Sequence, residues 1–63
     1  MKLETEAVIK ELERELETRR RVYPGWIHAT KISSDVAKHR IACIEKAIEL
    51  LKATIPQQQQ LFT

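Results

Sequence analysis

The sequence predicts an all-α fold: a two-helix antiparallel hairpin that assembles as a homodimeric four-helix bundle. The 63-residue chain contains one glycine and two prolines, too few for the turns of a barrel or sandwich, and helix-forming residues dominate it. Apolar residues recur three and four positions apart in two separate stretches, which is the spacing of a helix face. We assign residues 1–55 to the hairpin and residues 56–63 to a flexible C-terminal tail.

The first predicted helix covers residues 3 to about 22, which include neither glycine nor proline. Its apolar seam has the 3-4 spacing of a packed helix, with Arg19 as an interruption. The seam consists of Ile9, Leu12, Leu16, Tyr23 and Trp26. Pro24 lacks an amide donor and disfavours helical geometry at the residue before it. We therefore expect the helix to be kinked or restarted at Pro24, to end near Ala29, and to pack its two aromatic residues near the turn.

The second predicted helix follows a turn at residues 30–32 and extends to about Thr54. Ser33 or Ser34 can cap its start, and Asp35 places a negative charge in its first turn, where the helix dipole favours one. Its main apolar seam consists of Ala37, Ile41, Ile44, Ile48, Leu51 and Ile55. A second apolar stripe beside it consists of Val36, Cys43, Ala47 and Leu50. So wide an apolar surface is typical of a helix with more than one neighbour.

The length of the chain predicts the homodimer. Below about 70–80 residues a single core is marginal unless a disulfide, a metal or an oligomer interface reinforces it. Cys43 is the only cysteine, which excludes a disulfide within the chain, and on an apolar stripe we expect it to be a small buried hydrophobe. Two copies of Cys43 and His39 could together hold zinc, but such pairs are usually coincidental, so we predict no metal and no cofactor.

The tail carries the best functional lead. Gln58-Gln59-Gln60-Leu61-Phe62 resembles the short motif by which bacterial replication and repair proteins bind the DNA sliding clamp: glutamine, two variable residues, leucine and phenylalanine. The resemblance implies that Gln58 is the polar anchor and that Leu61 and Phe62 fill a hydrophobic pocket. The family more often has leucine and then serine or aspartate at the two variable positions. Packing of Leu61 and Phe62 onto the bundle is the alternative.

A second resemblance concerns the body of the chain. The run Arg19-Arg20-Arg21-Val22-Tyr23-Pro24-Gly25-Trp26-Ile27, followed by Lys31-Ile32-Ser33, is similar to small uncharacterised proteins of bacteriophages and prophages. The similarity covers about residues 9–52, although those proteins often have glycine where Thr30 stands. It implies a short helical phage protein and supplies no activity by itself.

These observations together predict a non-enzymatic, cytoplasmic, phage-type adaptor that binds a bacterial sliding clamp for recruitment or inhibition. A chain this short cannot readily enclose a catalytic pocket, and no apolar run approaches the roughly 18–20 residues of a membrane span. One alternative is a structural or protein-interaction hairpin with an inert tail. Another is a weak nucleic-acid binder that uses Arg19, Arg20 and Arg21, but the net charge of only +2 and six acids among residues 1–17 argue against it.

Overall fold

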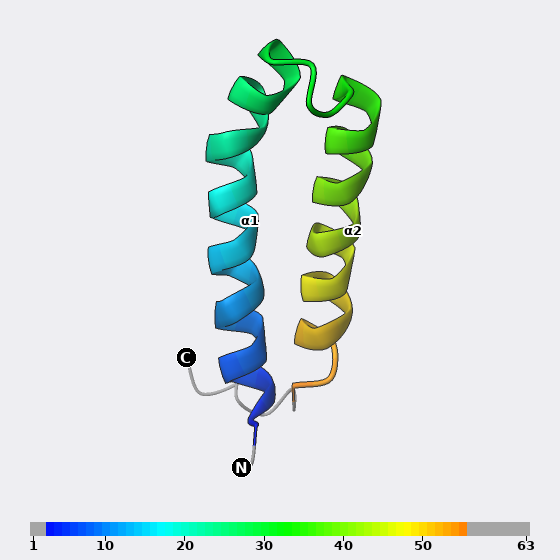
Figure 1. Ribbon diagram of the computed structural model, residues 1–63. Coiled ribbons are helices and arrows are strands. Elements are labelled where there is room, and N and C mark those ends of the chain that lie inside the picture. Colours follow the sequence, from blue (N-terminus) through cyan, green and yellow to red (C-terminus); the bar gives the residue numbers. More distant parts are fainter. Residues whose placement is uncertain (1–2, 56–63) are drawn as a thin grey trace.

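The computed structural model describes residues 3–55, which form two helices side by side. Helix α1 spans Thr5–His28 and helix α2 spans Ser34–Lys52, and the chain reverses direction between them at one end of the molecule (Figure 1). The described residues contain no strand. The predicted all-α antiparallel hairpin is therefore confirmed.

Pro24 lies inside α1, which is one continuous helix from Thr5 to His28. A restart of the helix at Pro24 is thus excluded. Proline removes a single backbone donor, and it does so near the end of a helix that spans 24 residues. Burial of Tyr23, whose exposed fraction is 3%, holds this part of α1 against α2, so packing outweighs the local preference of the residue before proline.

The end of α1 is closed by two backbone hydrogen bonds that together form a Schellman motif. The amide of Lys31 donates to the carbonyl of Trp26 at 2.8 Å, and the amide of Thr30 donates to that of Ile27 at 3.0 Å. This motif requires a left-handed residue, and Thr30 has φ of 57°. A β-branched side chain is unfavourable there, where glycine would be free of steric penalty.

Replacement of Thr30 by glycine should therefore stabilise the hairpin by about 0.5–1 kcal/mol, since the relieved strain exceeds the entropy that glycine loses on folding. Urea denaturation followed by circular dichroism measures the change. Thr30→Ala is the matched control, because alanine removes the hydroxyl but keeps the Cβ that causes the strain. A destabilised Thr30→Gly variant would contradict this account of the turn.

The start of α2 is capped as predicted. The hydroxyl oxygen of Ser33 accepts a hydrogen bond from the amide of Val36 at 3.1 Å, and Asp35 lies in the first turn. At the other end α2 stops at Lys52, slightly before the predicted Thr54. The amide of Thr54 then donates to the carbonyl of Leu51 at 3.0 Å, so a turn follows the helix directly.

The core lies between the two helices along the predicted seams. Ile9, Leu16 and Ile48 form its buried centre. Partly buried residues pack against this centre, namely Leu12, Ile41, Ile44, Leu51 and Ile55. Near the turn, Tyr23 and Ala37 are also buried.

Trp26 and Cys43 do not have the environments that we expected. The Trp26 side chain is 43% exposed and touches Tyr23, with ring centroids 5.5 Å apart. Three residues correspond to about 300° of helix rotation, so Trp26 lies beside the seam that buries Tyr23, and a single neighbouring helix cannot cover it. Cys43 is exposed for the same reason, as are Val36 at 41% and Leu50 at 58%.

Candidate functional site

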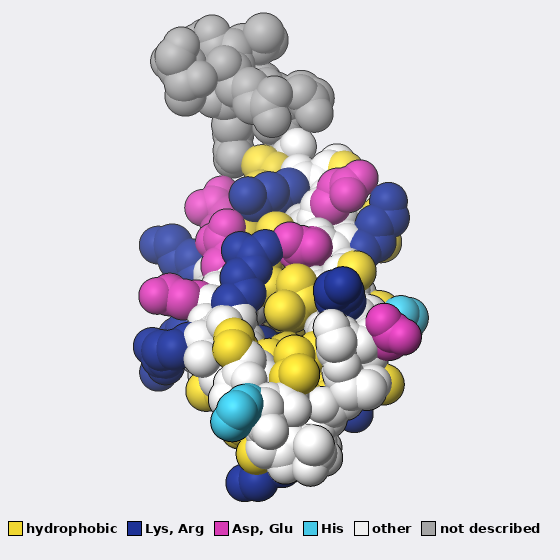
Figure 2. Space-filling model, turned by 90° about the horizontal axis from the view of Figure 1, so that it is seen from above, with side chains coloured by type: hydrophobic (Ala, Val, Ile, Leu, Met, Phe, Trp, Pro, Cys, Tyr) yellow, Lys and Arg dark blue, Asp and Glu magenta, His cyan; other side chains and the backbone are white. Residues whose placement is uncertain are grey.

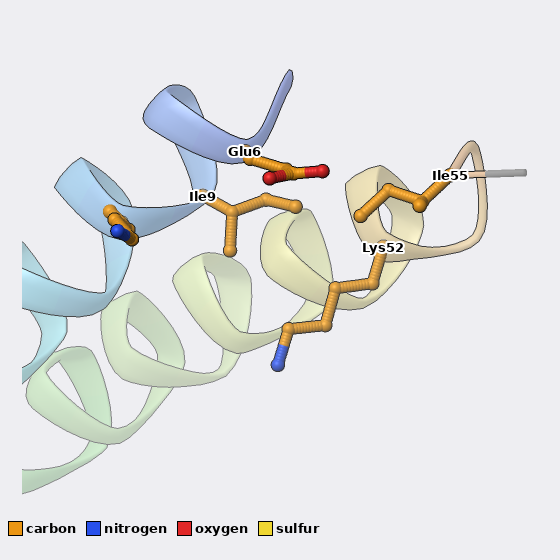
Figure 3. Close-up of a pocket in the computed structure, with 5 residues that line it drawn as sticks. Glu6, Ile9, Lys52 and Ile55 are labelled. Atoms are coloured by element: carbon orange, nitrogen blue, oxygen red, sulfur yellow. The ribbon is translucent and has the colours of Figure 1, made fainter. Parts of the chain in front are cut away.

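The three residues that resemble the clamp-binding motif, Gln58, Leu61 and Phe62, lie outside the described residues. Ile55, the last of the described residues, lies beside the N-terminal turns of α1 (Figure 3). Ile55 therefore lies at the open end of the hairpin, opposite the turn between the helices.

A groove of about 320 Å³ lies at this open end. Its lining combines Ile9 and Ile55 with the charged residues Glu6, Lys10 and Lys52, and Figure 3 shows residues from both ends of the described chain around the same space. Lys52 also forms an ion pair across the helices, with its Nζ 3.5 Å from Oε2 of Glu13. This groove could not be predicted from the sequence, because it is created by the antiparallel alignment of residues 6–10 with residues 52–55.

The three arginines considered for nucleic-acid binding have different surroundings. Arg19 donates from Nη2 to Oε1 of Glu15 at 3.1 Å and from Nη1 to the hydroxyl of Tyr23 at 3.3 Å. These hydrogen bonds, first with Tyr23 and then with Glu15, raise the pKa of Arg19 above its ordinary value. Arg20 forms an ion pair with Glu45 of α2, and Arg21 is exposed. Two of the three cations are thus already paired with carboxylates, which weakens the case for a phosphate-binding patch.

Among the ion pairs described for residues 3–55, two connect α1 with α2, and helical periodicity alone does not predict them. Arg20 pairs with Glu45, and Glu13 pairs with Lys52. Within each helix an acid precedes a base by seven residues, so both lie on one side of the helix. Because α1 and α2 run antiparallel, each acid then lies opposite a base of the other helix. We call the side of the hairpin that carries Glu13, Arg20, Glu45 and Lys52 the ion-paired face.

A second groove, of about 350 Å³, lies beside Trp26. Here Arg40 of α2 approaches a part of α1 that includes Arg19 and Trp26. The full lining consists of Glu15, Thr18, Arg19, Val22, Tyr23, Trp26 and Arg40. Arg40 was not singled out in the sequence, because its closeness to Arg19 depends on the register of the two helices.

His39 and Cys43 lie one helical turn apart, with Nε2 of His39 3.5 Å from Sγ of Cys43. Within residues 3–55 no group of three or more His, Cys, Asp or Glu side chains could hold a metal ion. Two ligands fall short of the three or four protein ligands of ordinary zinc sites, so this pair alone defines no metal centre.

Neither α1 nor α2 is long and apolar enough to cross a membrane. Comparisons of the chain with models of protein families, with curated proteins and with solved structures found no match.

Proposed function

We propose that this chain is a non-enzymatic, phage-type adaptor whose peptide Gln58–Phe62 binds a bacterial DNA sliding clamp. The observation that carries the proposal is the spacing of one glutamine three residues before an adjacent leucine and phenylalanine. In such a peptide the apolar pair supplies most of the affinity by filling a pocket. The glutamine amide, which both donates and accepts hydrogen bonds, fixes the orientation.

The arrangement of the described residues is compatible with a carrier for this peptide. Both helices belong to the hairpin core, and α2 ends at Lys52, six residues before the first residue of the motif in the sequence. Self-association of the hairpin into a homodimer would present two peptides together. A clamp with repeated pockets would then bind the second peptide at a raised effective concentration, provided that the tails can span the pockets.

A protein-interaction hairpin is the second candidate, and the exposure of Val36, Cys43 and Leu50 favours it. In that case a partner would bind the helices, and deletion of residues 57–63 would leave binding intact. Nucleic-acid binding through Arg19, Arg20 and Arg21 is a weaker alternative, because Arg19 and Arg20 are paired with Glu15 and Glu45. Such binding would fall steeply with salt.

A pair of neighbouring glutamines provides the test of the clamp proposal. The full chain is titrated against a panel of purified bacterial sliding clamps, and the Kd is measured by isothermal titration calorimetry. Gln58→Ala should weaken binding about tenfold, as expected for a lost side-chain hydrogen bond of about 1–1.5 kcal/mol. Gln59→Ala, at a variable position, should change the Kd less than about twofold. Failure of the unaltered chain to bind any clamp, or equal losses for both variants, would contradict the proposal.

A further inference from the structure

The two broad sides of the hairpin differ in chemistry. One is the ion-paired face. Arg19 lies on the opposite side of α1, across the seam from Arg20, because each residue adds about 100° of rotation. Arg40 lies on the same side of the hairpin in α2, because it lines the groove that also contains Arg19 and Trp26.

This opposite side combines apolar side chains with Glu15, Arg19 and Arg40, which line its groove. We call its apolar part the apolar face and define it by Val8, Val22, Trp26, Val36, Cys43 and Ala47. Trp26, Val36 and Cys43 are exposed, and the other three residues are partly exposed. Figure 2, in which the molecule is seen from above, shows hydrophobic side chains among Lys, Arg, Asp and Glu side chains, some of which also lie over the middle of the molecule. A contiguous exposed apolar patch on a small protein is typical of an interaction site.

Charge is also separated along the length of the hairpin. The half nearer the turn, residues 18–41, contains six Lys and Arg residues against Asp35 alone, a net charge of +5. The half nearer the open end, residues 3–17 and 42–55, contains eight Glu against four Lys and Arg, a net charge of −4. The molecule is therefore complementary to a second copy of itself turned end for end.

We propose that the apolar face binds a second copy of this chain, with the two turns at opposite ends of the dimer. A two-fold axis across the face would lay the positive half of each copy over the negative half of the other. The arrangement with both turns at one end would instead oppose like charges, which disfavours association. Because both copies use the same surface, the interface is isologous and association stops at the dimer, as in most homodimers.

The size of the side of the hairpin that carries the apolar face suits such a dimer. The paired part of the hairpin is about as long as α2, whose 19 residues span about 28 Å at 1.5 Å per residue, and two helices side by side are about 20 Å wide. The projected area is thus roughly 600 Å² for each copy before surface relief is counted, close to the roughly 800 Å² per partner of a stable interface. This inference deepens the self-association proposed above and does not depend on clamp binding.

Two alanines of α2 provide a matched test of the interface. Ala47 is on the apolar face and partly exposed, whereas Ala42 is exposed and lies away from it. Analytical ultracentrifugation should show a dimer for the unaltered chain, a dimer dissociation constant raised at least tenfold by Ala47→Glu, and less than a twofold change for Ala42→Glu. Circular dichroism checks that each variant remains helical. A monomer at every concentration, or a dimer that is weakened only by Ala42→Glu, would overturn the proposal.

The orientation is tested by a distance within the dimer. Lys31→Cys in a Cys43→Ala background places one spin label at each exposed turn. Pulsed electron paramagnetic resonance should give a separation of about 35 Å, close to the length of α1. A separation below about 20 Å would place both turns at one end and overturn the proposed arrangement. This measurement does not use Ala47→Glu, so it determines the orientation of the two copies even if that variant unfolds. Neither experiment involves residues 56–63, so their failure is distinguishable from failure of clamp binding.

Discussion

Leu16→Ala should destabilise the protein by about 2–5 kcal/mol, the range measured for leucine truncation in a closely packed core. Leu16 is 9% exposed and belongs to the buried centre with Ile9 and Ile48, so truncation leaves a cavity between the helices. A core of this size supplies only about 3–5 kcal/mol in total. The variant should therefore be largely unfolded at 25 °C, with its helical circular dichroism lost.

The control for this prediction is Leu3→Ala. Leu3 is 68% exposed and precedes α1, so the same chemical change should alter the free energy of unfolding by less than about 0.5 kcal/mol. Both variants should be compared by urea denaturation at one protein concentration, because association with a second copy adds to the apparent stability. Similar stabilities for the two variants would show that Leu16 is not part of the core.

The double variant Leu61→Ala/Phe62→Ala should abolish measurable binding to a sliding clamp. Each side chain is expected to act as a hot spot worth at least about 2 kcal/mol, and a joint loss of about 4 kcal/mol raises the Kd roughly a thousandfold. The measurement is calorimetric titration of the full chain with the clamp that binds it most tightly. Because both positions follow α2, the helical signal and the melting temperature should not change.

Gln57→Ala/Gln60→Ala is the matched double variant. It also removes two side chains from the tail but leaves the three motif residues in place, so it should bind within about threefold of the unaltered chain. Clamp binding that survives loss of Leu61 and Phe62 would reject the peptide as the binding element. It would favour a contact with the helices instead.

Much of the fold could be predicted because helical periodicity depends only on the sequence. The 3-4 spacing placed Ile9, Leu16 and Ile48 on the facing sides of two helices, and all three are buried. Ser33 was also predictable, since a cap is a local hydrogen bond. Continuity of α1 through Pro24 was not, because it depends on packing against α2.

The surface was harder to predict, since exposure depends on how many neighbours each helix has. The stripe that contains Cys43 has the spacing of a buried face, yet in a single hairpin no further helix covers it. The ion pairs of Arg20 with Glu45 and of Glu13 with Lys52 required the register between the helices. For the clamp motif, the sequence supplies the residue types and their spacing, and binding to a clamp stays a prediction.

Trp26 is the only tryptophan of the chain, and its half-open position against Tyr23 gives the protein an intrinsic optical reporter. Indole emission moves to shorter wavelength when water leaves the ring. Binding of any molecule over Trp26 should therefore shift the tryptophan emission maximum to shorter wavelength. This change can be measured without a dye and without alteration of the sequence.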